Sequence, residues 1–252
     1  MKRITVLILA VFAMQMQLSA QRKLTFPASD NLMVTADQYL FDAGAPYIIL
    51  FHQENSSRGE FREIAPRLVR MGFNCLAVDL RTGRESNFVQ NETAALAQKN
   101  ELKIDLLDAE IDMRAAMDYI EKMALNRQYL VFGSSFSATL ALKAANQNRR
   151  VAAVIAFSPG EYFSPLKATD WLKDFDRLTY VSYIGREEPF VAELEKEIPA
   201  ELLTKYRQPG IGVRGAPALW SDNEQANSGW MSLMMFINKV REEKFKIETN
   251  PK

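Results

Sequence analysis

Five apolar runs of strand length recur along most of the chain. They are continuous rather than alternating, which is the pattern of parallel strands covered by other elements on both faces. The runs occupy residues 47–51, 75–78, 129–132, 151–157 and 178–184. Two further strands are predicted at the margins, an antiparallel one at 34–40 and a short last one at 209–213.

Helical periodicity fills the intervals between these runs. Apolar residues spaced by three and four predict amphipathic helices around residues 61–68, 106–120 and 230–237. Parallel strands separated by helices require crossover connections, which are right-handed in nearly all sheets. The pattern therefore predicts an α/β fold, with a doubly wound, mostly parallel sheet flanked by helices.

Composition adds limits to this picture. Of the 252 residues, 48% are hydrophobic and 25% are charged, which is enough to bury one large core. No repeat or Pro/Gly-rich linker divides residues 21–252, so we expect a single domain there. Lys and Arg number 31, as do Asp and Glu, and no dense basic stripe occurs. This balance argues against a nucleic-acid partner and favours a small-molecule ligand.

The first twenty residues have a different character. Lys2 and Arg3 precede an apolar run at 4–14, and small residues follow just before position 21. This arrangement is typical of a secretory signal peptide, here residues 1–20. The alternative, an uncleaved membrane anchor, is disfavoured because two glutamines shorten the apolar span. We therefore expect an exported protein, periplasmic or secreted, with no stable membrane anchor once the signal is removed.

A candidate nucleophile lies between the third apolar run and a helical stretch at 138–146. The connecting residues, 133–137, read Gly-Ser-Ser-Phe-Ser. Ligands bind at the carboxyl ends of the strands in open α/β sheets, which is where this turn lies. A serine on a sharp turn between strand and helix exposes its hydroxyl, so Ser135 is the candidate nucleophile.

Three segments together resemble the α/β-hydrolase superfamily, particularly its dienelactone-hydrolase-like and small-esterase branches. The serine turn matches Gly-x-Ser-x-Gly, with Ser137 in place of the last glycine. Residues 79–86 are similar to the superfamily's Asp-x-Arg-Gly-x-Gly-x-Ser turn, with Thr82 replacing one glycine. His52 is similar to the histidine that ends its third strand, although Gln53 follows it. The resemblance covers nearly everything after the signal peptide, and it implies hydrolysis of carboxylic esters or related acyl compounds.

The resemblance also implies roles for residues around the nucleophile. The backbone N–H of Phe136 and one from Gln53 or Glu54 would bind the oxyanion that develops when Ser135 attacks. His52 would shape the loop that carries the second of these donors. In this interpretation His52 supports the oxyanion loop and does not take the serine proton.

The residues expected as the acid and the base that assist the serine match the superfamily pattern less well. By resemblance, Glu187 or Glu188 lies where the superfamily keeps its acid, and Glu161 is a weaker candidate; a solvated helix start is the alternative interpretation. The histidine expected after the last strand is missing, and Arg214 occupies its position. A guanidinium stays protonated and cannot accept the serine proton. Arg214 would instead pair with one of the glutamates and preserve the shape of the site without turnover.

Two hypotheses follow for the function. The first is a serine esterase whose activity is weak or depends on an unusual base. The second is an inactive pseudohydrolase that binds a small ligand or a protein. Lys143 is a poor substitute base because helical geometry points it away from the turn. No cofactor or metal is predicted, since His52 and Cys75 cannot form a zinc site and no phosphate-binding glycine motif occurs. The aromatic residues Tyr162, Phe163 and Trp171 form either a cap over the pocket or buried packing.

Overall fold

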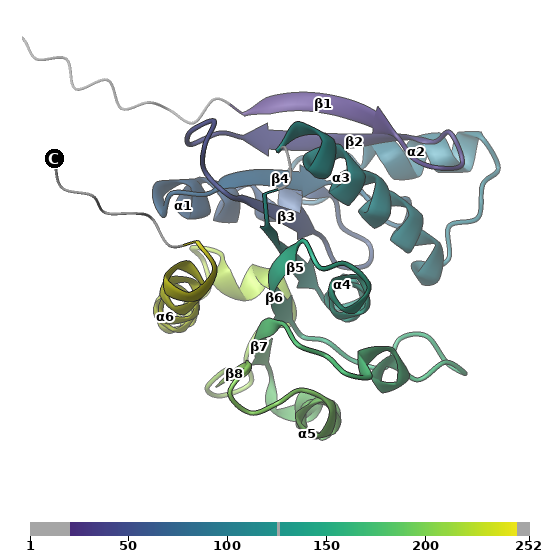
Figure 1. Ribbon diagram of the computed structural model, residues 1–252. Coiled ribbons are helices and arrows are strands. Elements are labelled where there is room, and N and C mark those ends of the chain that lie inside the picture. The colour runs from purple at the N-terminus through teal and green to yellow at the C-terminus, as the bar shows by residue number, and fades with distance from the viewer. Residues whose placement is uncertain (1–20, 125–126, 246–252) are drawn as a thin grey trace, which may run out of the picture.

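The computed structural model of the protein describes residues 21–124 and 127–245 (Figure 1). The predicted signal peptide, residues 1–20, lies outside the described residues. The strands are β1 (Arg22–Pro27), β2 (Met33–Tyr39), β3 (Tyr47–Phe51), β4 (Asn74–Val78), β5 (Tyr129–Ser134), β6 (Val151–Phe157), β7 (Leu178–Tyr183) and β8 (Leu203–Arg207). The α-helices are α1 (Ile64–Arg70), α2 (Glu92–Lys99), α3 (Ala109–Met123), α4 (Phe136–Gln147), α5 (Glu188–Glu197) and α6 (Ala226–Lys244). The short 3-10 helices are η1 (Arg58–Phe61), η2 (Leu106–Asp108), η3 (Ala168–Leu172), η4 (Gly185–Glu187) and η5 (Ala216–Leu219).

The eight strands form one sheet in the order β1-β2-β4-β3-β5-β6-β7-β8. Strands β3 to β8 are parallel to one another, whereas β1 and β2 form an antiparallel edge. Crossover connections through helices are what parallel neighbours require. The fold class predicted from the sequence, a doubly wound and mostly parallel α/β sheet, is therefore confirmed.

The antiparallel strand predicted at 34–40 is confirmed as β2 (Met33–Tyr39), but the outermost strands of the sheet differ from the prediction. The last strand is not at 209–213, as the sequence pattern indicated, but at Leu203–Arg207. Gly210 and Gly212 have φ angles of 62° and 67°, a left-handed conformation that turns the chain away from the sheet. The first strand, β1, was not predicted at all. Both are edge strands that mix polar with apolar residues and are exposed or half-buried at most positions, instead of forming a continuous apolar run.

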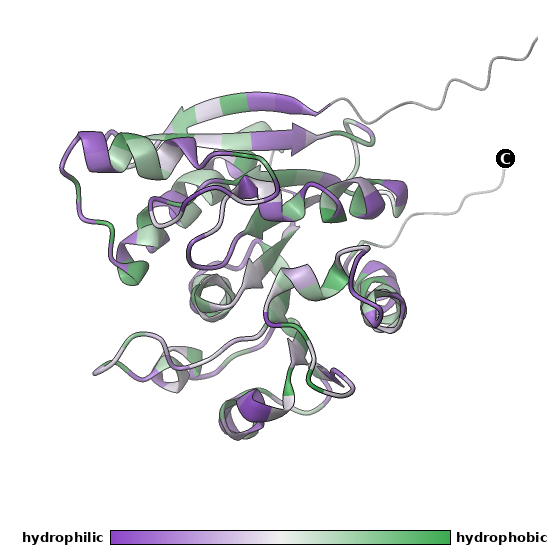
Figure 2. Ribbon diagram, turned by 180° about the vertical axis from the view of Figure 1, so that it is seen from behind, coloured by the Kyte–Doolittle hydropathy of each residue, from purple (hydrophilic) through white to green (hydrophobic). Residues whose placement is uncertain are grey.

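Helices cover both faces of the sheet. Figure 1 shows α1 and α6 on one face, and α3, α4 and α5 on the other. The central strands supply both cores: on β3, Ile48 and Leu50 pack with the α1 and α6 side, while Ile49 and Phe51 pack with the opposite side. In Figure 2 the hydrophobic colour gathers in these central strands. Continuous apolar strands are the result of burial on both faces.

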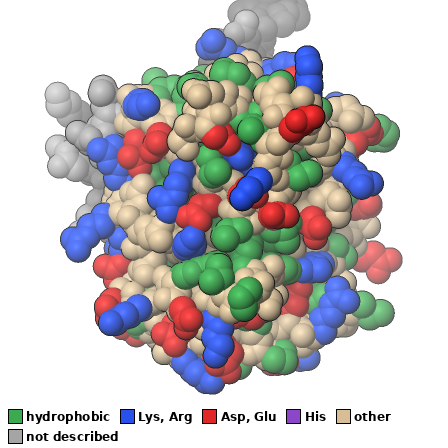
Figure 3. All heavy atoms as spheres, turned by 90° about the vertical axis from the view of Figure 1, so that its right-hand side faces the viewer, with side chains coloured by type: hydrophobic (Ala, Val, Ile, Leu, Met, Phe, Trp, Pro, Cys, Tyr) green, Lys and Arg blue, Asp and Glu red, His purple; other side chains and the backbone are tan. Residues whose placement is uncertain are grey.

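The surface of the described part mixes charges of both signs. On the face shown in Figure 3, basic and acidic side chains are interspersed rather than segregated. Within residues 21–124 and 127–245, no helix has both the length and the apolar character needed to cross a membrane. The same residues contain no group of three or more His, Cys, Asp and Glu side chains placed to hold a metal ion.

Buried ion pairs fix the loop that follows β4. The Arg81 guanidinium lies 2.8 Å from Asp112 on α3 and 2.7 Å from Asp30, measured between nitrogen and oxygen. Asp79, two residues earlier, accepts a 2.5 Å ion-pair contact from Arg58 on η1. Arg81 and Asp79 belong to the turn whose pattern is similar to that of the α/β hydrolases. Their charges therefore hold this turn against α3 and η1 instead of facing solvent.

We expect Asp112→Ala to lower the free energy of unfolding by about 3–5 kcal/mol, because it leaves the Arg81 charge buried without its main partner. Asp118→Ala, on the exposed side of the same helix, is the matched control. Urea unfolding of both variants measures the difference. Equal losses in the two variants would contradict the proposed importance of the buried pair.

Candidate active site

Ser135 lies on a strained turn between β5 and α4. Its backbone angles are φ 59° and ψ −122°. Such a conformation costs a residue with a Cβ atom about 1–3 kcal/mol, and it persists only when neighbouring contacts enforce it. Here the Ser135 N–H donates to the Phe157 carbonyl at 2.7 Å, and the Ser135 carbonyl accepts from the Ala138 N–H at 2.9 Å. The turn thus holds Ser135 at the carboxyl end of β5, where it is only 5% exposed.

Gly133 and Ser137 show how this turn meets and departs from the hydrolase pattern. A Cβ atom on Gly133 would lie 2.4 Å from the Cα atom of Ala138, so α4 can approach β5 this closely only at a glycine. The Ser137 hydroxyl donates to the Phe51 carbonyl at 2.8 Å and accepts from the Ser134 N–H at 2.9 Å. Serine in place of the last glycine therefore ties the turn to β3.

The Ser135 hydroxyl contacts a phenol. Ser135 Oγ lies 3.3 Å from the hydroxyl of Tyr162, a residue in the connection after β6. The Tyr162 hydroxyl donates to the Ser158 carbonyl at 2.8 Å and accepts from Arg214 Nη2 at 2.6 Å. The Arg214 guanidinium carbon also lies 5.2 Å from the centre of the Tyr162 ring. A phenol whose proton is given to a carbonyl is a poor acceptor for the serine proton.

The loop after β8 brings Arg214 to this position. The N–H of Gly215 donates to Ser158 Oγ at 3.0 Å, and the N–H of Ala216 donates to Ser134 Oγ at 2.8 Å. Gly215 has φ 75°, and a Cβ atom there would lie 2.6 Å from Ser134 Oγ. The loop is therefore docked on the ends of β5 and β6, directly beside the nucleophile turn.

The two candidate acids have different partners. Glu187 Oε1 lies 3.8 Å from Arg214 Nε, and its other oxygen accepts the Ile184 N–H at 3.0 Å. Glu188 instead lies beside Arg207 on β8, with 3.4 Å between Oε2 and Nε. Of the two glutamates, Glu187 is the one that the structure brings to Arg214.

Glu161 and Lys143 have partners of their own. The Glu161 carboxylate accepts the Ala168 N–H at 3.1 Å, at the start of η3. Lys143 Nζ lies 2.5 Å from Glu110 on α3. In the described part of the chain neither side chain contacts Ser135, so neither is brought into the site.

His52 is fully buried behind the loop that follows β3. Its Nε2 accepts the Leu80 N–H at 2.9 Å, which assigns the proton to Nδ1, 2.7 Å from the Gln53 carbonyl. Burial lowers the pKa of His52 to about 4, although the Gln53 carbonyl opposes this change. His52 is therefore neutral at physiological pH, and both of its ring nitrogens are engaged in shaping the loop.

Two backbone N–H groups suit a developing oxyanion. The Phe136 N–H belongs to the first residue of α4, where no helical acceptor is available and the helix dipole favours negative charge. On the other side of the site, the Gln53 N–H donates to Glu60 Oε2 at 3.1 Å. Of the two candidates in this loop, the Gln53 N–H is therefore engaged, and the Glu54 N–H is the remaining candidate.

Glu60 is a buried carboxyl that sequence reasoning missed. It lies on η1 with 0% exposure, and its main-chain carbonyl accepts the Trp220 Nε1–H at 2.8 Å. Burial raises the pKa of Glu60 to about 7, against the opposing effect of the Ser134 and Ser56 hydroxyls and the Gln53 N–H. Glutamates are almost never fully buried without a charged partner, which makes this one a candidate for a functional role.

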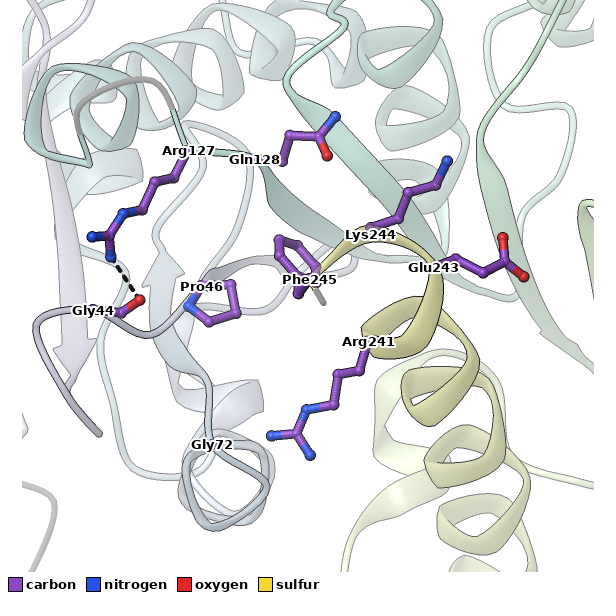
Figure 4. Close-up of a pocket in the computed structure, with 9 residues that line it drawn as sticks. All are labelled: Gly44, Pro46, Gly72, Arg127, Gln128, Arg241, Glu243, Lys244 and Phe245. Carbon is purple, nitrogen blue, oxygen red and sulfur yellow. Dashed lines mark hydrogen bonds between the residues drawn. The ribbon is translucent and has the colours of Figure 1, made fainter. Parts of the chain in front are cut away.

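A separate pocket lies at the other end of the sheet. Figure 4 shows Pro46 before β3, Gln128 before β5 and Phe245 after α6 around a hollow of about 660 Å³. Arg127 closes one side by donating to the Gly44 carbonyl at 2.6 Å. These residues mark the amino ends of the strands, whereas α/β sheets bind substrates at the carboxyl ends. This pocket is therefore distinct from the site around the nucleophile turn.

Comparison with known families agrees with this geometry. The model of the dienelactone hydrolase family matches residues 37–208, which is more than half of the chain. The chain belongs to the dienelactone hydrolase family. The matched span includes Ser135 and Glu187, while Arg214 lies beyond its end. The α/β-hydrolase resemblance seen in the sequence is thereby confirmed.

Solved structures of other hydrolases share the fold of this dienelactone hydrolase family member. An esterase from Pyrococcus furiosus matches with a TM-score of 0.65 and 14% identity, over 88% of this chain and 91% of that one. A dienelactone hydrolase from Anabaena variabilis matches at 0.63 and 16%, over 89% and 98%. Est1E from Butyrivibrio proteoclasticus matches at 0.63 and 12%, over 86% and 98%. No curated protein matches the chain significantly. At these identities the likeness shows the fold, and activity has to be inferred from the site itself.

The raised pKa of Glu60 makes the stability of the protein depend on pH. Because the folded-state pKa, about 7, exceeds the ordinary value of 4.5, the stabilising effect of the neutral carboxyl is complete below about pH 4.5 and is lost as the pH rises through 7. Glu60→Gln keeps the shape and remains neutral. We expect its free energy of unfolding to decrease less than that of the wild type between about pH 5 and about pH 8.5.

Urea unfolding at both pH values measures this difference. Glu63→Gln is the control. Glu63 lies in the same segment as Glu60 and its carboxylate accepts the Ser221 N–H, so the pH dependence of the unfolding free energy in this variant should follow that of the wild type. Parallel pH dependence in the wild type and Glu60→Gln would show that Glu60 does not titrate in this range.

Proposed function

We propose that the protein is an exported serine hydrolase with weak activity on carboxylic esters or related acyl compounds. One observation carries the proposal: Ser135 is held on a strained turn, while its hydroxyl meets the Tyr162 hydroxyl, to which Arg214 donates, where an imidazole would be needed. The strain at Ser135 supports a role for this hydroxyl, since strain is retained mainly at functional sites. The guanidinium of Arg214 supports low activity, because it cannot accept a proton.

The residues around the turn suit the steps of acyl transfer. Ser135 Oγ attacks the acyl carbonyl and loses its proton to solvent water, and the N–H groups of Phe136 and Glu54 bind the oxyanion that forms. When this intermediate collapses, the ester C–O bond breaks, the alcohol leaves, and an acyl-serine remains for water to hydrolyse. Glu187 orients Arg214, which in turn holds the phenol beside the nucleophile. Without a base, the oxyanion hole and substrate binding still provide about 10³–10⁴ of rate enhancement over water. In such a site, activated esters acylate Ser135 slowly, and hydrolysis of the acyl-serine is slower still.

Export is supported by the segment that precedes the fold. The basic start, the apolar run and the small residues before position 21 have the order of a secretory signal. Strand β1 begins at Arg22, just beyond this cleavage site. Cleavage would therefore leave all eight strands of the sheet in place.

A binding module without catalysis is the second candidate function. The hydrogen bonds of the Tyr162 hydroxyl favour this function, because the group already donates to the Ser158 carbonyl and accepts from Arg214. Together with Glu187 these contacts form a closed polar network in place of an acid–base pair. A protein with this network would take a small ligand or a partner protein at the same site and leave it unchanged.

Labelling with a fluorophosphonate probe distinguishes the two functions. We expect slow covalent labelling of the wild type and none of Ser135→Ala, because only an accessible hydroxyl beside oxyanion donors reacts with the probe. Ser228→Ala, an exposed serine on α6, is the control and should label like the wild type. Absence of label from the folded wild type would favour the binding module.

Arg214→His should restore a proton acceptor near Ser135. We expect hydrolysis of p-nitrophenyl acetate to rise by at least about tenfold, since a well-placed general base contributes about 10²–10⁴. Arg207→His is the matched control, because it replaces another arginine that is paired with a glutamate, at the end of β8. An unchanged rate in a folded Arg214→His protein would show that position 214 is not the base position.

A further inference from the structure

A buried carboxyl lies beneath the proposed site, and the proposed mechanism does not use it. Glu60 Oε2 accepts the Gln53 N–H at 3.1 Å. Its other oxygen, Oε1, has no hydrogen-bond partner among the residues that the structure describes. A fully buried polar atom without a partner costs free energy, so its retention calls for an explanation.

We propose that Glu60 is a positioning residue that couples the oxyanion loop to the nucleophile turn. This inference rests on the proposed function, and it concerns how that site is held and how it responds to pH. Glu60 contacts two segments beside the site: its carboxylate accepts the Gln53 N–H, and its main-chain carbonyl accepts the Trp220 Nε1–H. The Ser134 hydroxyl, on the nucleophile turn, lowers the pKa of Glu60 from nearby, although Oε1 accepts no hydrogen bond from the described residues.

The Glu54 N–H depends on this arrangement. In a planar trans peptide the carbonyl and the following N–H point in opposite directions. The Gln53 carbonyl is held toward His52 Nδ1 at 2.7 Å, so the Glu54 N–H of the same peptide points away from the buried imidazole. Glu60 fixes the preceding peptide through the Gln53 N–H. Together His52 and Glu60 therefore set the direction of the second oxyanion donor.

The ionisation of Glu60 would change the strength of this contact. Burial raises the pKa of Glu60 to about 7, so the carboxyl changes charge near neutral pH. An ionised carboxylate is a stronger acceptor for an N–H than a neutral acid is. As the pH rises through neutrality, the bond to the Gln53 N–H strengthens and the Glu54 N–H is held more firmly.

Of the other charged groups nearby, Asp79 has a pKa that falls in the tested range, since burial raises it to about 6 against the opposing charge of Arg58. A transition caused by Asp79 would persist in Glu60→Gln, which distinguishes it from one caused by Glu60. Burial lowers the pKa of His52 to about 4, so the imidazole stays neutral throughout. On the segment of Glu60 itself, Arg58 is paired with Asp79, and Glu63 accepts from Ser221 near the surface. Arg62, on the same segment, is exposed and bonds to a main-chain carbonyl. On the turn of the nucleophile, Ser134 and its neighbours are uncharged.

Two measurements on the same samples test the coupling. Amide chemical shifts of Gln53 and Glu54 are followed by NMR from about pH 5.5 to about pH 8.5, and the rate of fluorophosphonate labelling of Ser135 is measured over the same range. We expect both amides and the labelling rate to change with one midpoint near 7. The labelling rate at the alkaline end should exceed that of Glu60→Gln by about fivefold, while the variants are similar at the acidic end.

The variants separate a positioning role from a structural one. Glu60→Gln should remove the transition of both amides, whereas Glu63→Gln should retain it. The coupling would be overturned if the amide chemical shifts of Gln53 and Glu54 did not change with pH, or if they changed equally in Glu60→Gln. This holds even if Ser135 is labelled. Conversely, intact titration of both amides with no labelling at any pH would support the coupling of Glu60 to the loop and refute the hydrolase function.

Discussion

The hydroxyl of Tyr162 determines what the site can do, because it lies between Ser135 and Arg214. It is the partner of the Ser135 hydroxyl at 3.3 Å, and Arg214 donates to it at 2.6 Å. Acyl transfer by a serine requires a group that accepts the hydroxyl proton as the oxygen attacks. A phenol that donates to a carbonyl and accepts from a guanidinium has little capacity left for that proton. The fold therefore presents a nucleophile turn with weak means of activating it.

The rest of the structure keeps this arrangement in place. Hydrogen bonds to β6 and from α4 compensate for the strain at Ser135, and the lack of a side chain at Gly133 allows α4 to pack closely there. The loop that carries Arg214 is docked on Ser134 and Ser158 through two backbone N–H groups. On the far side, buried ion pairs of Arg81 hold the turn after β4. These constraints hold the turn and the Arg214 loop together in the fold of the family, with Arg214 at the position where the sequence pattern led us to expect a histidine.

The central sheet and the nucleophile turn could be predicted from the sequence because each depends on a short stretch of neighbouring residues. Continuous apolar runs report burial on two faces, and these were the strands placed most closely. Edge strands such as β8 (Leu203–Arg207) are half exposed and contain several polar residues, so their sequence was less informative than the apolar residues near Pro209. The sequence alone indicated Ser135 and Arg214 as candidate site residues, because Ser135 lies in a turn motif and Arg214 lies in the loop before the last helix.

Tyr162 and Glu60 were not assigned to the site because their roles depend on contacts between distant loops. Tyr162 was noted only as an aromatic residue of a cap or of the core, and nothing in its local sequence shows that its hydroxyl meets Ser135. Glu60 directly precedes Phe61, the first apolar residue of the predicted helix at 61–68, and this position beside the core was the one local signal of its burial. Its bond to the Gln53 N–H could not be inferred without the fold.

The most direct test of the central claim is the pre-steady-state release of p-nitrophenol from p-nitrophenyl acetate. A nitrophenyl ester is more reactive than the acyl-serine that it forms. Without a base, hydrolysis of the acyl-serine should therefore be much slower than its formation. We expect one equivalent of p-nitrophenol per protein, dependent on Ser135, followed by a far slower steady rate. Multiple turnovers from the outset, at rates of about 10 s⁻¹ as in ordinary enzymes, would show that the serine is fully activated and would contradict the account.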